Sequence, residues 1–307
     1  MAKIGQEVTS NDAKKIIIIS GATCTNKSKL ALDFALENNG AIVNADALQI
    51  YRDLKILSAQ PSLNDQKKIP HFLYSHLDCD QKCSVDIWLK LVKDIVENIW
   101  NQKKIPIVVG GTGLYISKLV DGITQMPQIT LQIRAQAQQL FLEMGIIEFQ
   151  KKFGDDKIKD KQRLIRACEI MLTSNQPISY WQNQPAQKIF PDAKFIHVNL
   201  NLDRKIIYQN CDQRLLRMLE CGAIEEVKNF ISKNNDDNLP ICKTLGFLEI
   251  KAYLQKKLSY QEMQKIIQQK TRNYAKRQLT WFRHQFEEIN FFENIIDAKY
   301  FLDQNSK

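Results

Sequence analysis

Long apolar runs are missing from this chain of 307 residues. No stretch approaches the roughly 20 consecutive apolar residues that a membrane-spanning helix needs. The first residues, Met1–Glu7, also lack the apolar core of a secretory signal peptide. We therefore expect a cytoplasmic protein with no membrane partner.

Histidine is also scarce, with four residues, and the cysteines lack a disulfide pattern. The seven cysteines form an odd, irregularly spaced set, unlike the even framework of a small secreted disulfide fold, so we expect reduced thiols. His71, His76, Cys79 and Cys83 lie close together in the sequence. Zinc sites usually pair two close ligands with a second pair some distance away. We interpret this cluster as a polar loop and keep a metal site as the alternative.

Acidic residues are nearly absent from one part of the chain. The protein carries 43 basic and 34 acidic residues, a net charge of +9. Between Lys251 and Arg283 there are nine basic residues and only one acidic residue, Glu262, which leaves a local charge of 9 − 1 = +8. Such a stripe attracts a polyanion through counterion release. A solvated helix face is the alternative.

Strands and helices alternate in the first part of the chain. Apolar, β-branched runs predict strands at Ile16–Ile19, Ala41–Asp46 and Ile105–Val109, and alternation predicts a returning strand at Lys194–Leu200. Helical sequence follows the first strand at Lys29–Leu36. Helical sequence also fills Val85–Trp100. This order predicts an α/β fold with a doubly wound parallel sheet of the P-loop NTPase type.

Between Ser117 and Phe190 the strand signal disappears, and polar helical sequence with breaks near Gly154 and Pro177 replaces it. We interpret this stretch as a small helical insertion domain. The predicted organisation is a first part of the core at 1–116, an insertion at 117–193, and completion of the core with basic helices at 194–307.

The loop after the first strand has the spacing of a phosphate loop, G-x-x-x-x-G-K-[ST], at Gly21–Ser28. Asn26 stands where the second glycine belongs. That position needs a positive φ, which glycine adopts freely and asparagine adopts more often than most residues. Lys27 would neutralise phosphate oxygens, and Ser28 would hold Mg²⁺. An ordinary strand-to-helix turn is the alternative.

Two further strand ends should meet this loop at the same edge of the sheet. Asp46 ends the second strand as a capping carboxylate, a Mg²⁺ ligand or a general base. The glycine-rich turn Gly110–Gly113 ends the third strand. Because ligands bind at the carboxyl ends of parallel strands, these segments should line one crevice.

Two arginines fall on apolar helical stripes at about 100° per residue. With Lys270 taken as the centre of the stripe, Arg277 shares it with Tyr274 and Trp281. Arg214 shares another stripe with Cys211 and Met218. An inward arginine needs a carboxylate or a bound anion, because a buried unpaired charge is costly. We keep both kinds of partner, a carboxylate and a bound anion, as alternatives for each arginine. Lys276 and Arg283 fall on the opposite face from Arg277, where a polyanion could be gripped.

The chain resembles the tRNA dimethylallyltransferases of the bacterial type over roughly residues 16–283. The most specific segment is Thr271–Arg283, with the sequence TRNYAKRQLTWFR. The other segments that carry the resemblance are Gly21–Ser28, Asp46–Arg52, Ser58–Ser62, Pro70–His71, Gly110–Tyr115, Gln162–Ala167, Met218–Gly222 and Leu245–Phe247.

The resemblance implies transfer of a dimethylallyl group from dimethylallyl diphosphate to N6 of adenosine 37, in tRNAs that read codons beginning with U. It implies Mg²⁺ as cofactor, a monomer, and Asp46 as general base, with Thr23 and Arg214 also catalytic. The implied diphosphate-binding residues are Gly21, Ala22, Thr23, Cys24, Thr25, Asn26, Lys27, Ser28 and Arg277.

The implied partner is the anticodon stem-loop of tRNA, with its target base flipped out of the stack. The implied contacts are Asp46, Ala47, Leu48, Gln49, Thr112, Arg134, Gln162, Arg163, Leu164, Ile165, Arg166, Lys243, Gly246, Phe247, Lys276 and Arg283. The chain departs from the family pattern at Ala22, Asn26, Ala47 and Phe247. A tRNA-binding protein with an inactive phosphate loop is therefore the alternative function, and a small-molecule P-loop kinase is a third.

Overall fold

The computed structural model describes residues 14–154, 158, 160–286 and 289–306. Its strands are β1 (Lys15–Gly21), β2 (Gly40–Asn44), β3 (His71–Phe72), β4 (Ile105–Gly110), β5 (Lys194–Leu200) and β6 (Asn290–Phe292). Its helices are α1 (Lys27–Glu37), α2 (Leu63–Lys68), α3 (Val85–Asn101), α4 (Gly113–Asp121), α5 (Leu131–Phe153), α6 (Lys161–Ser174), α7 (Ile178–Gln182), α8 (Arg204–Glu220), α9 (Ala223–Lys233), α10 (Phe247–Leu254), α11 (Tyr260–Gln285) and α12 (Ile295–Asn305), with a 3₁₀ turn at Pro240–Lys243.

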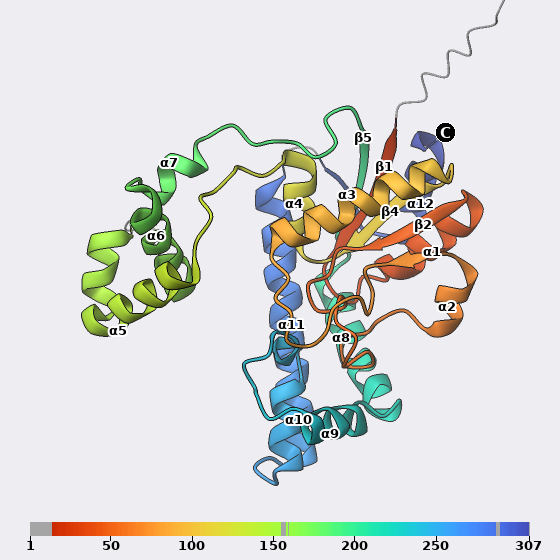
Figure 1. Ribbon diagram of the computed structural model, residues 1–307. Helices are drawn as coiled ribbons and strands as arrows, with labels where there is room; N and C mark the ends of the chain where they lie inside the picture. The colour runs from red at the N-terminus through yellow and green to blue at the C-terminus, as the bar shows by residue number, and fades with distance from the viewer. Residues whose placement is uncertain (1–13, 155–157, 159, 287–288, 307) are drawn as a thin grey trace, which may run out of the picture. The chain divides into compact units, whose positions relative to one another are not determined.

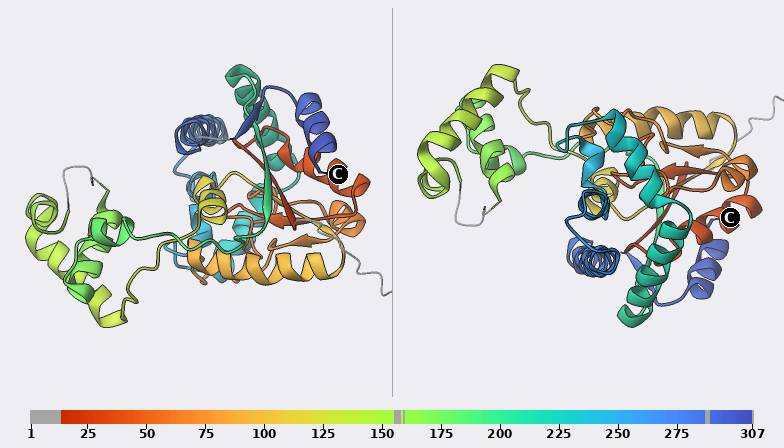
Figure 2. Two further views of the ribbon diagram at one scale, coloured as in Figure 1. Left: turned by 90° about the horizontal axis from the view of Figure 1, so that it is seen from above. Right: turned by 90° about the horizontal axis from the view of Figure 1, so that it is seen from below.

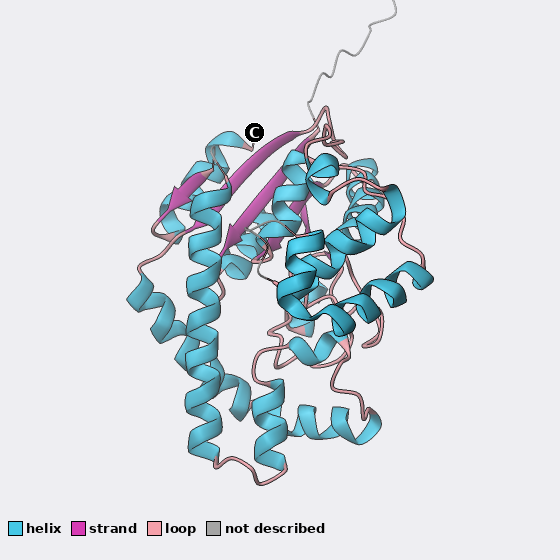
Figure 3. Ribbon diagram, turned by 90° about the vertical axis from the view of Figure 1, so that its left-hand side faces the viewer, coloured by secondary structure: helices cyan, strands magenta, loops and turns pink. Residues whose placement is uncertain are grey.

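Within the described residues, six strands form one sheet in the order β3-β2-β4-β1-β5-β6, and every pairing is parallel. Figure 3 shows these strands side by side, with helices around them. The predicted parallel α/β fold is confirmed. Strands β3 and β6 were not predicted, because two or three residues are too few to show a period.

Helices cover both faces of the sheet. Ile17 and Ile19 of β1 pack against Phe34 of α1 and Leu302 of α12 in one buried cluster. On the opposite face, Trp88 of α3 donates a hydrogen bond to the carbonyl oxygen of Asn44. Figure 2 shows α1 and α12 on one side of the sheet and α3 on the other. The sheet is therefore buried on both faces, as parallel sheets usually are.

The chain divides into two compact units. One contains the residues up to Val120 and from Ile189 onward, and the other contains Asp121–Lys188. The sequence placed these boundaries at 116/117 and 193/194.

Figure 1 shows α9 and α10 beside α11 at the end of that helix away from the sheet.

The second unit is helical, with α5, α6 and α7 around a small apolar core that includes Phe149 and Leu164. Gly154 ends α5 and Pro177 precedes α7, so both predicted breaks are present. A further break at Gly145, with φ 69°, interrupts α5 and was not predicted.

Among the described helices, none is long and apolar enough to cross a membrane. All seven cysteines lie in the described part of the chain and are free thiols, as predicted.

Candidate active site

The loop Gly21–Ser28 joins the carboxyl end of β1 to the N-terminus of α1. Asn26 has φ 62° and ψ 23°, the left-handed conformation expected of a residue that replaces a glycine. Cys24 is left-handed as well, with φ 65°. Gly21 has φ 146°, and a Cβ there would lie 2.7 Å from the carbonyl oxygen of Leu200. The sharp turn of a phosphate loop is thus made with asparagine in a glycine position.

Hydrogen bonds within the loop fix its shape. Thr25 Oγ1 and Lys27 Nζ both donate to the carbonyl oxygen of Ala22, at 2.9 and 3.1 Å. Asn210 of α8 donates to the carbonyl oxygen of Cys24 at 3.1 Å. The Asn26 side chain makes no capping hydrogen bond, so it does not occupy the first-turn amides of α1. Those amides and the helix dipole favour an anion at this end of the helix.

A cavity of about 400 Å³ opens beside the loop. Residues predicted for the site that line it are Thr23, Cys24, Asn26, Lys27, Ser28, Asp46, Leu48, Gln49, Arg214, Lys243 and Arg277. Ala22 and Thr25 are fully buried, so their side chains shape the loop and are not available to a ligand. The structure therefore brings most of the predicted diphosphate site together around one space.

Asp46 follows β2 and is held by its own backbone surroundings. Its Oδ1 accepts hydrogen bonds from the amides of Leu48 and Gln49, at 2.9 and 3.3 Å. The Thr112 hydroxyl accepts one from the amide of Ala47, at 3.0 Å, which ties this turn to the end of β4. Among the described residues, no hydrogen bond is made to the other carboxylate oxygen, so Oδ2 is available to accept a proton.

The two arginines of the cavity have no carboxylate partner among the described residues. Among the described residues, neither Arg214 nor Arg277 forms an ion pair. The Nε of Arg214 is buried without a hydrogen-bond partner. Burial lowers the pKa of Lys27, and the nearby Asp46 carboxylate opposes this by raising it. An unpaired buried donor beside a lysine is the expected arrangement for an anion site.

Arg277 differs from its predicted placement. The sequence analysis pointed it inward, but its side chain is exposed and its guanidinium lies 5.6 Å from the Tyr274 ring centre. The buried stripe of α11 is centred near Thr271, Ala275 and Gln278. At about 100° per residue this is one position away from the assumed centre, Lys270. Arg277 reaches the cavity from the edge of the helix.

Three side chains at the candidate site were not predicted from the sequence. Tyr74 and Tyr274 line the cavity, and burial raises the pKa of both phenols. Gln278 Oε1 accepts a hydrogen bond from the backbone amide of Thr23 at 2.8 Å, which links α11 to the phosphate loop. Tyr274 and Gln278 both lie in the Thr271–Arg283 segment, so that segment carried the signal. No sequence pattern pointed to Tyr74, because the strand before it, β3, has only two residues.

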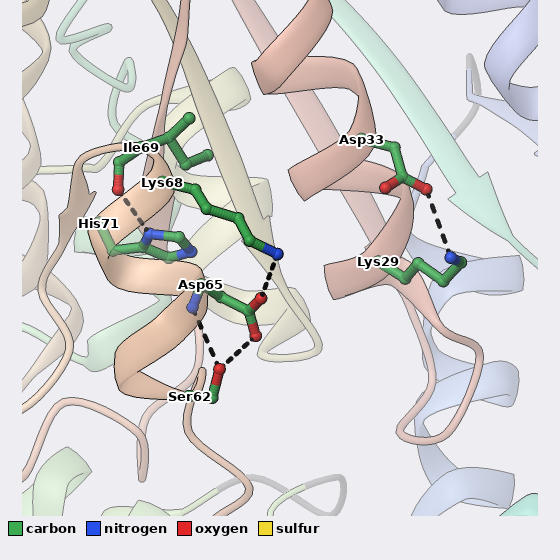
Figure 4. A network of polar contacts seen from close by, with 7 residues as sticks. All are labelled: Lys29, Asp33, Ser62, Asp65, Lys68, Ile69 and His71. Atoms are coloured by element: carbon green, nitrogen blue, oxygen red, sulfur yellow. Dashed lines mark hydrogen bonds and ion pairs between the residues drawn. The ribbon is translucent and has the colours of Figure 1, made fainter.

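A second cavity of about 380 Å³ shares Ser28, Lys29, Tyr74 and Val109 with the first. Its charges are paired, as Figure 4 shows. Lys29 lies 3.8 Å from Asp33, and Lys68 lies 3.5 Å from Asp65. His71 Nδ1 is hydrogen-bonded to the carbonyl oxygen of Ile69. Because these charges cancel, this cavity has less attraction for an anion than the first.

Several residues implied for tRNA binding lie in the same unit as the cavity. Thr112 and Gln49 are partly buried and hydrogen-bonded within the site. Lys243, Lys276 and Arg283 are exposed. Gly246 is buried at the start of α10, where its φ of 94° needs a glycine.

Phe247 is only 1% exposed and packs against Phe230, so its side chain is unavailable to RNA. In the basic stripe, Lys251, Lys270 and Arg272 pair with Asp237, Glu249 and Asp212, which reduces the charge left for a polyanion.

The helical unit holds the other implied tRNA contacts. Arg134, Gln162 and Arg163 are exposed on α5 and α6. Arg166 forms an ion pair with Glu169, at 3.0 Å, and Ile165 is half-buried. Leu164 is fully buried in the core of this unit, so its side chain cannot contact RNA.

Ser28 was the predicted magnesium ligand. Its side chain is exposed at the cavity, beside the start of α1. Within the described residues there is no group of three or more histidine, cysteine or acidic side chains that could hold a metal ion. A magnesium ion at Ser28 would therefore take most of its ligands from water and phosphate oxygens, which fits the coordination that Mg²⁺ prefers.

Comparison with known proteins gives one consistent family. A family model described as IPP transferase matches residues 49–285, and one described as Isopentenyl transferase matches residues 14–74. The tRNA dimethylallyltransferase of Ehrlichia chaffeensis is 38% identical over 287 residues, which cover 91% of this chain and 94% of the relative. That of Pelagibacter ubique is 39% identical and covers 88% of each chain.

Solved structures give the same fold. The tRNA isopentenylpyrophosphate transferase of Bacillus halodurans superposes with a TM-score of 0.69 over 95% of this chain and 96% of the other, at 23% identity. A eukaryotic dimethylallyltransferase acting on tRNA superposes with a TM-score of 0.71 over 88% of this chain and 70% of the other, at 27% identity.

Proposed function

The chain belongs to the IPP transferase family, and from this premise we propose that it is a tRNA dimethylallyltransferase. The reaction joins a dimethylallyl group from dimethylallyl diphosphate to N6 of adenosine 37. The substrates are tRNAs that read codons beginning with U.

One observation carries the proposal. An asparagine-containing phosphate loop borders a cavity in which the Arg214 and Arg277 guanidinium groups lack carboxylate partners among the described residues. A structural ion pair would have compensated these charges, whereas a diphosphate does so only when it is bound. The arrangement thus favours an anionic ligand over a purely structural role.

The chemistry follows from the charges that develop. Breaking the allylic C–O bond leaves negative charge on diphosphate, which Lys27, Arg214 and the amides at the start of α1 stabilise. The amine N6 attacks the allylic carbon and loses one proton. Asp46 Oδ2 accepts that proton, while the bonds from Leu48 and Gln49 to Oδ1 keep the carboxylate oriented.

Mg²⁺ bound at Ser28 would neutralise part of the charge on the departing diphosphate. The chain's own contribution is the Ser28 hydroxyl at the cavity wall.

The proposed RNA partner is the anticodon stem-loop. The exposed Lys243, Lys276 and Arg283 offer phosphate contacts in the same unit as the cavity.

The test incubates the protein with a U-reading tRNA, dimethylallyl diphosphate and Mg²⁺, then digests the tRNA for mass spectrometry. We expect a prenylated adenosine at position 37 and none without the diphosphate. A tRNA that is bound but never modified would support the alternative, a binding protein with an inactive loop. Release of phosphate from ATP without prenylation would support a kinase.

A further inference from the structure

Two thiols meet behind the phosphate loop and take no part in the mechanism above. Cys24 belongs to the loop, and Cys211 belongs to α8, one helical turn before Arg214. Both are buried, at 8% and 1% exposure, in one small apolar cluster that also contains Ala22. The two side chains are hydrogen-bonded to each other.

Their surroundings make the two thiols unequal. The hydrogen bond from Cys211 lowers the pKa of Cys24, burial raises it, and Arg214 and Lys27 lower it further. The same hydrogen bond, followed by burial, raises the pKa of Cys211. Cys24 is therefore the more acidic of the two thiols. This is the division between an attacking and a resolving cysteine.

The position of Cys24 makes it accessible to small oxidants. Although little exposed overall, it lines the 400 Å³ cavity that the loop borders. Cys211 lies behind it and does not line that cavity. An oxidant that enters the cavity consequently meets Cys24 before Cys211.

We propose that Cys24 and Cys211 form a redox-active dithiol, which hydrogen peroxide converts to a disulfide that closes the site to diphosphate. The Cys24 thiolate attacks one oxygen of the peroxide, giving a sulfenic acid and hydroxide. Cys211 then attacks the Cys24 sulfur, the S–O bond breaks, and water leaves with the thiol proton. Overall two thiols and one peroxide give one disulfide and two waters.

The disulfide changes the loop because a covalent bond is shorter than a hydrogen bond. The S–S bond length is about 2.05 Å, well below the separation of two hydrogen-bonded sulfurs. Forming it draws Cys24 and the α8 residue Cys211 together. Cys24 already has a left-handed backbone, and its carbonyl oxygen is held by Asn210 at 3.1 Å. The shift distorts the turn that presents the loop to an anion.

The test does not depend on prenyl transfer, because its readouts are the thiol state and the binding of inorganic pyrophosphate. The purified protein is treated with hydrogen peroxide, alkylated and digested for mass spectrometry, and calorimetry measures pyrophosphate binding. We expect a peptide linking Cys24 to Cys211, loss of pyrophosphate binding, and recovery of both after dithiothreitol. Saturating pyrophosphate during the treatment should slow the linkage.

Two variants test which cysteines take part in the oxidation. Cys211→Ser removes the resolving thiol, so peroxide should leave a Cys24 sulfenic acid that dimedone labels. Cys221→Ser removes an exposed cysteine outside the cluster and should behave like the unaltered protein. Oxidation of Cys221 without a link between Cys24 and Cys211 would overturn the proposal. Undiminished pyrophosphate binding by linked protein would overturn the closure of the site.

Discussion

The side-chain amide of Gln278 bridges the two turns that border the active site. Its Oε1 accepts a hydrogen bond from the amide of Thr23 at 2.8 Å, and its Nε2 donates one to the carbonyl oxygen of Gly111 at 2.7 Å. Gln278 is 7% exposed, and a Cβ on Gly111 would lie 2.4 Å from that nitrogen. A helix far along the chain thus fixes the phosphate loop and the glycine-rich turn relative to each other.

We expect Gln278→Ala to weaken both folding and ligand binding. The variant leaves two buried backbone groups unpaired, each worth about 1–3 kcal/mol. Thermal denaturation should show a lower unfolding temperature, and calorimetry a weaker affinity for pyrophosphate. Gln269→Ala, at an exposed position of the same helix, is the matched control. Pyrophosphate affinity equal to that of the unaltered protein would show that the bridge does not position the loop.

Substitutions at Asn26 test whether the natural phosphate loop is active or degenerate. Asn26→Gly keeps the left-handed turn, so we expect transfer to change little. Asn26→Val forces a β-branched residue into φ 62°, which costs roughly 1–2 kcal/mol or more, and should reduce transfer strongly. The measurement is prenylated adenosine formed per unit time. A large gain from negligible activity in the glycine variant would instead mark the natural loop as degenerate.

Arg214→Met should separate ligand binding from stability. The variant loses charge-assisted hydrogen bonds to diphosphate, worth about 1.5–3 kcal/mol each, or roughly a 10–100-fold loss of affinity. The unfolding temperature should stay equal or rise, because the Nε of Arg214 is buried without a partner. Arg272→Met is the control, since Arg272 already pairs with Asp212 at 3.0 Å. A destabilised Arg214→Met with intact pyrophosphate binding would contradict this assignment.

Much of this site could be read from the sequence because its elements are local. The run Ile16–Ile19 followed by the spaced loop residues predicts strand, turn and helix, and asparagine has the one conformation that the missing glycine requires. The carboxyl ends of parallel strands meet at one edge, so Asp46 and the glycine-rich turn could be placed without coordinates.

Other features depend on contacts that no local pattern encodes. Gln278 is a polar residue in a polar helix, and only tertiary packing shows that its amide faces the loop. The helical projection took Lys270 as the centre of the buried face and therefore pointed Arg277 inward. Lys270 is instead half-exposed, and it pairs with the buried Glu249. Phe247 and Leu164 were assigned to RNA by resemblance, but apolar burial removes both from the surface.

Asp46→Asn tests the general base with the loop intact. The amide oxygen of asparagine can still accept the hydrogen bonds from Leu48 and Gln49, so the turn should survive. Loss of the base should lower the rate of transfer by about 10²–10⁴-fold, while tRNA binding in a filter assay stays near normal. Asp33→Asn, on the solvent side of α1, is the control. Unchanged turnover in Asp46→Asn would remove this residue from the mechanism.

The buried His197 should make the protein less stable in mild acid. Its Nε2 lies 2.8 Å from Ser20 Oγ, and burial lowers its pKa from 6.5 to about 3. Between these values the unfolded chain binds the proton and the folded chain does not, so the free energy of unfolding falls as the pH falls.

We expect a slope of about 1.4 kcal/mol per pH unit from this residue below pH 6.5, measured by urea denaturation at a series of pH values. Full stability is regained above the unfolded-state pKa, because both states are then neutral. His197→Gln removes the titrating group and should flatten the profile in this window, even where it lowers the overall stability. His76→Gln, at an exposed position, should leave the slope as it was. If the His197→Gln profile keeps the original slope, carboxylates and not this buried imidazole set the acid sensitivity of the fold.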